Sequence, residues 1–68
     1  MSIKDVTRII ERASRDATFL NELNRNPEQA LSSYSLSPAE RTALAAGDMG
    51  KLEALGVDPR ITKGAPIN

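Results

Sequence analysis

Residues 26–56 read NPEQALSSYSLSPAERTALAAGDMGKLEALG, and this stretch contains three helix starts and two helix stops. Asn26–Glu28 and Ser37–Glu40 each place a polar residue before a proline, which favours the first turn of a helix. Gly47 ends the second of these helices, and Gly56 ends a third. Starts and stops at such short intervals predict several short helices that meet at sharp angles.

The strongest local signal in this stretch is the start of a helix that we predict from Pro38 to Ala46. Ser37 stands at the N-cap, Pro38 at the first helical position and Glu40 at the third, a pattern that forms a full capping box. Gly47 follows the last helical residue, where it favours a left-handed exit from the helix. Both ends of this helix are therefore predicted from local sequence.

An amphipathic helical region precedes this stretch, because apolar residues recur there at spacings of three and four. These residues are Ile3, Val6, Ile9, Ile10, Ala13, Ala17 and Leu20. Asp16 is suited to cap a second helical segment at 17–25, and Asn26 is expected to cap a third that begins at Pro27. With the helices at 38–46 and 49–55, the sequence predicts an all-α fold, a compact bundle of about five short helices.

The last segment of the chain, 57–68, differs in composition from the rest. It contains Pro59, Gly64 and Pro66 and shows no apolar period of 2 or 3.6 residues. We therefore predict an extended, flexible C-terminal tail without a core of its own. The expected organisation is a helical recognition domain at 1–56 followed by this tail.

The composition argues against catalysis and against several classes of partner. A chain of 68 residues buries only about 60% of its unfolded surface, and this one has no Cys and no His. It therefore lacks disulfides, thiolate metal ligands and the usual general base, so we expect no enzyme activity, metal or cofactor. Nine basic and nine acidic residues cancel, which disfavours nucleic acid as a partner. We expect no membrane span and no secretory signal, and hence a cytoplasmic location.

The helix predicted at 49–55 is the expected partner-binding element. Met49, Leu52 and Leu55 recur on one side of it, and Asp48 caps its start. A methionine on such a face suits an adaptable binding surface, but it also suits a position that simply fills the core. We predict that these four residues contact a larger protein, together with the first helix.

The helix signals between residues 14 and 58 also follow a recognisable order. In sequence they are D-x-x-F-L at 16–20, N-P-E-x-x-L at 26–31, L-S-x-x-E at 36–40 and A-G-D-M-x-x-L-x-x-L at 46–55. This order resembles the small alpha subunits of protocatechuate 4,5-dioxygenase-type enzymes, which open aromatic rings by extradiol cleavage. It is also similar to the recognition domain of split borosin precursor peptides.

The borosin resemblance implies a ribosomally made precursor whose helical body binds a separate α-N-methyltransferase. The segment at 57–68 would then be the core peptide, which the body presents for methylation at backbone nitrogens. The nitrogens of Pro59 and Pro66 carry no hydrogen, so Ile61, Thr62 and Ile67 are the positions where modification is expected.

Two alternatives remain open from the sequence. The first is a small accessory subunit of an extradiol dioxygenase, in which the catalytic subunit carries the metal and the acid–base residues. The second is a small helical protein that associates with itself, for example as a homodimer, because a core this small gains from a partner.

Overall fold

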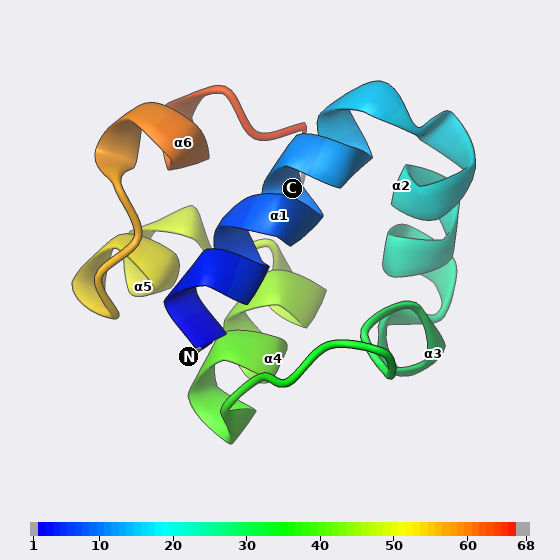
Figure 1. Ribbon diagram of the computed structural model, residues 1–68, viewed down its shortest axis with the longest axis horizontal. Helices are drawn as coiled ribbons and strands as arrows, with labels where there is room; N and C mark the ends of the chain where they lie inside the picture. The colour runs from blue at the N-terminus through cyan, green and yellow to red at the C-terminus, as the bar shows by residue number, and fades with distance from the viewer. Residues whose placement is uncertain (1, 67–68) are drawn as a thin grey trace.

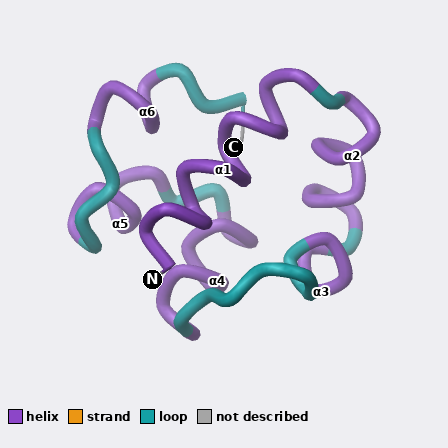
Figure 2. The backbone as a smooth tube through the Cα atoms, in the orientation of Figure 1, coloured by secondary structure: helices purple, strands orange, loops and turns teal. Residues whose placement is uncertain are grey.

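The computed structural model of the chain describes residues 2–66, which form six helices and contain no strand. The helices are α1 (Ser2–Arg15), α2 (Ala17–Arg25), α3 (Pro27–Ala30), α4 (Pro38–Ala46), α5 (Met49–Ala54) and α6 (Pro59–Lys63). They pack into one compact, all-helical globule (Figures 1 and 2). The predicted all-α class is therefore confirmed. No helix among the described residues is long and apolar enough to cross a membrane.

Helix α1 is the longest helix and packs against α2 and α6. In Figure 1 it runs through the middle of the molecule, with α2 and α3 to one side and α5 and α6 to the other. Four residues of its predicted apolar stripe, Val6, Ile9, Ile10 and Ala13, are buried, and Ile3 is half-buried. Ala17 and Leu20, which were predicted to continue the stripe, lie on α2, where Ala17 is exposed. The remaining core residues come from α2, α4, α5 and the turns that follow α3 and α5, and are Phe19, Leu23, Leu31, Ala43, Leu44, Leu52 and Val57.

Helices α2 and α3 begin where the sequence predicts, but their caps differ. The carboxylate of Asp16 accepts a hydrogen bond from the backbone N–H of Phe19 at 3.1 Å, as an N-cap should. The side chain of Asn26 makes no cap hydrogen bond, and its amide donates instead to Oε1 of Gln29 at 3.0 Å. Helix α3 therefore depends on Pro27 at its first position and on tertiary packing.

The capping box at the start of α4 forms as predicted. The backbone N–H of Glu40 donates to the hydroxyl of Ser37 at 3.2 Å, and the N–H of Ser37 donates to Oε1 of Glu40 at 2.9 Å. At the other end Gly47 adopts the left-handed conformation, with φ 68°. This helix places Ala43 and Leu44 in the core.

The predicted extended tail is wrong for Pro59–Lys63, which form α6. The carboxylate of Asp58 accepts from the backbone N–H of Arg60 at 2.9 Å, so an aspartate cap followed by proline starts this helix. The segment also has a core contribution, because Val57 and Thr62 are buried. Ile67 lies outside the described residues. The separate functions assigned to 1–56 and 57–68 stay a prediction.

Candidate functional site

The four predicted partner-binding residues do not share one exposed surface. Leu52 is 0% exposed, and Met49 is half-buried against the core. Leu55 is also half-buried, and only Asp48 is exposed. A partner could reach Leu52 only if α5 moved away from the core. The role of these residues in binding therefore stays a prediction, and in this structure the face serves mainly to hold α5 in place.

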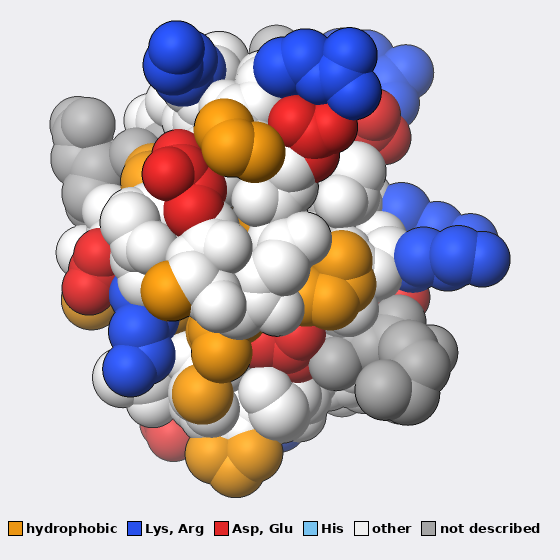
Figure 3. Space-filling model, turned by 90° about the vertical axis from the view of Figure 1, so that its left-hand side faces the viewer, with side chains coloured by type: hydrophobic (Ala, Val, Ile, Leu, Met, Phe, Trp, Pro, Cys, Tyr) orange, Lys and Arg blue, Asp and Glu red, His pale blue; other side chains and the backbone are white. Residues whose placement is uncertain are grey.

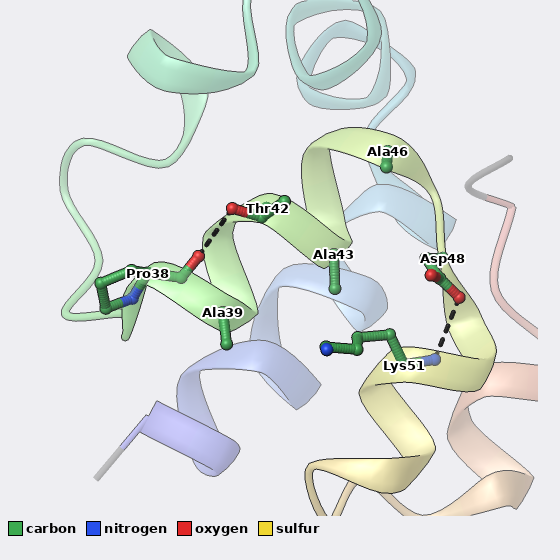
Figure 4. Close-up of a pocket in the computed structure, with 7 residues that line it drawn as sticks. All are labelled: Pro38, Ala39, Thr42, Ala43, Ala46, Asp48 and Lys51. Atoms are coloured by element: carbon green, nitrogen blue, oxygen red, sulfur yellow. Dashed lines mark hydrogen bonds between the residues drawn. The ribbon is translucent and has the colours of Figure 1, made fainter.

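A groove that the sequence interpretation missed lies between α4 and α5. Its volume is about 390 Å³, and Figure 4 shows its lining side chains around a shared space. They are Pro38, Ala39, Thr42, Ala43, Ala46, Asp48 and Lys51. One sequence signal could have indicated it, because Ala39, Ala43 and Ala46 recur at i, i+4 and i+7 on the predicted helix.

The groove is mostly apolar, and its polar groups are largely occupied. Ala43 is only 2% exposed, whereas Pro38, Ala39 and Ala46 are exposed. The hydroxyl of Thr42 donates to the carbonyl of Pro38 at 2.8 Å. These features make the groove suitable for small apolar side chains rather than for bond-making chemistry.

Two charged residues, Asp48 and Lys51, line the groove on the side of α5. The carboxylate of Asp48 accepts from the backbone N–H of Lys51 at 3.0 Å, which caps α5. The Lys51 ammonium makes no ion pair within the described part of the chain, and in Figure 4 its side chain extends toward Ala39 and Ala43. The groove therefore combines an apolar surface with one positive charge, from Lys51, and one negative charge, from the Asp48 carboxylate that caps α5.

The face that carries α5 and α6 has no single large apolar surface. Figure 3 shows its hydrophobic side chains as several small patches, with Lys and Arg side chains around the edge. Such a face is typical of a weak or small contact, because extended apolar patches mark larger interfaces.

A second hollow, of about 300 Å³, lies beside α1, α2 and α3, and three of its lining residues, Arg12, Asp16 and Phe19, already contact one another. The guanidinium of Arg12 lies 4.3 Å from the centre of the Phe19 ring. It also donates to the hydroxyl of Tyr34 at 3.2 Å and pairs with Asp16 at 3.7 Å. The hydrogen bond to Tyr34, above all, raises the pKa of Arg12. This cluster joins α1, α2 and the turn after α3, so we interpret it as structural.

The predicted modification positions lie within α6 and its hydrogen bonds. The backbone N–H groups of Ile61 and Thr62 both donate to the carbonyl of Asp58, at 2.9 and 3.3 Å. The Ile61 side chain is half-buried against the core, and Thr62 is buried. Both amides are thus engaged in the folded state.

Within the described residues, no group of three or more His, Cys, Asp or Glu side chains is placed to hold a metal ion. Comparisons of the chain with protein-family models, with curated proteins and with solved structures found no significant match. The function must therefore be argued from the groove, the C-terminal helix and the order of the sequence motifs.

Proposed function

We propose that the chain is a non-catalytic helical docking domain that binds a larger enzyme through the groove between α4 and α5. The observation that carries the proposal is an apolar groove, with Ala43 as its most buried lining residue, beside the ammonium of Lys51, which makes no ion pair among residues 2–66. A partner of matching chemistry presents a small apolar side chain with a carboxylate beside it. Contacts of this kind give specificity through charge and affinity through the apolar anchor.

The order of motifs between residues 14 and 58 supports a narrower version of this proposal. In it, the chain is a borosin-like precursor peptide and the larger enzyme is an α-N-methyltransferase. The enzyme would act on the C-terminal segment at Ile61, Thr62 or Ile67. Because the amides of Ile61 and Thr62 are hydrogen-bonded to Asp58, α6 has to unwind before methylation.

The burial of the C-terminal segment favours the other candidate, an accessory subunit of an extradiol dioxygenase. Val57 is 2% exposed and Thr62 is 4% exposed, so the segment belongs to the folded body. An accessory subunit has no need to release it. In this version the catalytic metal and the acid–base residues lie on the larger subunit.

The two versions are separated by the identity of the partner and by the mass of the native chain. We would measure binding of the purified chain to a methyltransferase and to an extradiol catalytic subunit encoded beside it. A gain of whole methylene masses in 57–68 of the natively produced chain supports the precursor version. An unmodified chain that binds the catalytic subunit supports the accessory-subunit version.

The groove itself is tested by a matched pair of variants on α4. Ala46 lines the groove, and Ala45 is exposed on the same helix outside it. We expect Ala46→Arg to weaken binding by about tenfold or more, because the long side chain occupies the space that the apolar anchor of the partner would fill. Ala45→Arg should bind like the unaltered chain. Equal affinity for both variants would place the docking surface elsewhere, and binding only to a second copy would establish self-association instead.

A further inference from the structure

Helix α6 is held to the rest of the molecule by a small set of contacts. Val57 and Thr62 are buried, while Ile61 and Ala65 are half-buried against the core. The helix packs against α5 and α1, on the side of the molecule seen in Figure 1 next to α5. The remaining side chains of α6 are exposed.

One side-chain hydrogen bond links α6 to α5. The hydroxyl of Thr62 lies within hydrogen-bonding distance of Oε2 of Glu53 on α5 and of the carbonyl of Pro59. The hydroxyl has one hydrogen, so the carboxylate, as the stronger acceptor, receives it. Across the described residues, this is the one side-chain hydrogen bond between α6 and another helix.

A turn at Gly56 precedes Val57 and α6. Gly56 has a φ of 115°, in the region that favours glycine, and a Cβ at this position would meet Cδ1 of Ile3 at 3.7 Å. The chain therefore turns sharply next to the start of α1. A five-residue helix after such a turn has little stability of its own, because isolated helices this short are marginal in water.

We propose that residues 58–65 form a C-terminal latch that opens from α5 and α1 while α1–α5 stay folded, and that the Thr62–Glu53 hydrogen bond sets how often it opens. The latch contributes one buried side chain, Thr62, and two half-buried ones, Ile61 and Ala65, and local opening occurs where contacts are few. In the closed state the backbone N–H groups of Ile61 and Thr62 donate to the carbonyl of Asp58. In the open state both amides become available. That last consequence rests on the proposed docking function, since it matters only to an enzyme that acts on this segment.

The test is hydrogen exchange of the full chain, with Thr62→Val compared with Thr42→Val. The two threonines share one feature, because each hydroxyl contacts a proline carbonyl within its own helix, but Thr42 is exposed and Thr62 is buried. Only Thr62 bonds a carboxylate on another helix. We expect Thr62→Val to speed exchange at the amides of Ile61, Thr62 and Ala65 by about tenfold, in line with the loss of one hydrogen bond to a charged acceptor. Exchange in α1 should not change, and Thr42→Val should leave the latch unaffected.

Glu53→Ala provides a second variant that removes the same hydrogen bond from the other side. It should speed latch exchange as Thr62→Val does, and the double variant should add little to either, because the two side chains act as a pair. Unchanged latch exchange in both variants would overturn the proposal. An equal rise in α1 and the latch would also overturn it, since the segment would then open only when the whole chain unfolds. Binding measured with Ala46→Arg is independent of this outcome, because that residue lies in the groove on α4.

Discussion

Helices α4 and α6 start in the same way but differ in length and in the conformation of the glycine that ends each of them. Each has a capping side chain followed by a proline, Ser37–Pro38 in one and Asp58–Pro59 in the other. Helix α4 runs from Pro38 to Ala46 and ends at a left-handed glycine, whereas α6 ends after Lys63 at a glycine with φ −90°. Shared caps begin a helix, but buried side chains and a reinforced exit decide how far it extends and how firmly it is held.

The largest expected difference lies in the core contacts of the two regions. Leu44 of α4 is 1% exposed, and we expect Leu44→Ala to lower the free energy of unfolding by about 2–5 kcal/mol. Val57→Ala, just before α6, should lower it by about 2 kcal/mol, because fewer buried carbons are lost. Urea unfolding followed by circular dichroism measures both. An equal loss for the two variants would show that the C-terminal segment is as important to the core as α4.

The capping box is expected to have the next largest effect. Ser37→Ala removes the hydroxyl that accepts from the N–H of Glu40, and we expect it to lower the free energy of unfolding by about 1 kcal/mol. Ser33→Ala, an exposed serine outside this cap, serves as the control and should have little effect. If the urea midpoint shifts equally for both variants, the hydrogen bonds of the capping box add no stability beyond what hydrogen bonds to water provide.

The two glycines that follow these helices should respond in opposite ways to alanine. Gly47 has a φ of 68°, so Gly47→Ala should destabilise the protein by about 1 kcal/mol through left-handed strain. Gly64 has a φ of −90°, and an added Cβ there meets nothing within 4 Å. Gly64→Ala should therefore be neutral or slightly stabilising, because it restricts the unfolded chain. Thermal unfolding of the two variants measures this. A lower melting temperature for Gly64→Ala would contradict the absence of close neighbours around Gly64.

The smallest expected effect is the pH dependence of α6. Hydrogen bonds from the Arg60 side chain and backbone hold the pKa of Asp58 below its ordinary value. A carboxylate with a lowered folded pKa stabilises the folded state above its unfolded pKa, and this contribution is lost as pH falls through the folded pKa. We therefore expect α6 to loosen at acidic pH.

The experiment for this last case is an NMR titration of the Asp58 carboxyl together with the amide shifts of α6. The variant Arg60→Gln should return the pKa of Asp58 toward its ordinary value, because the guanidinium is the main cause of the shift. If the pKa of Asp58 is the same with and without Arg60, the ion pair between them does not stabilise the start of α6.

Local sequence was sufficient for the parts of the fold that depend on caps and periodicity. The apolar stripe of α1, the Asp16 cap of α2 and the capping box of α4 are all present as predicted. Helix α6 was missed although Asp58–Pro59 carries a signal like that of Ser37–Pro38. The segment has too few apolar residues to show a helical period, so its cap was not recognised as the start of a helix.

The candidate site was less accessible to sequence reasoning than the fold. Periodicity placed Met49, Leu52 and Leu55 on one face of a helix, but it does not distinguish a face that meets a partner from one that meets the protein's own core. In the structure Leu52 is fully buried. The groove depends on the distance and angle between α4 and α5, and neither follows from a pattern within one helix.

By itself, the sequence determined where most of the helices begin and end, because caps, prolines and left-handed glycines act through contacts only a few residues apart. Tertiary structure alone decided that Val57 and Thr62 enter the core, that α6 closes on α5, and that Ala39, Ala43 and Ala46 line a groove. These outcomes depend on which surfaces remain to be covered once α1–α5 have packed. That information is distributed over the whole chain and is not contained in any one segment of it.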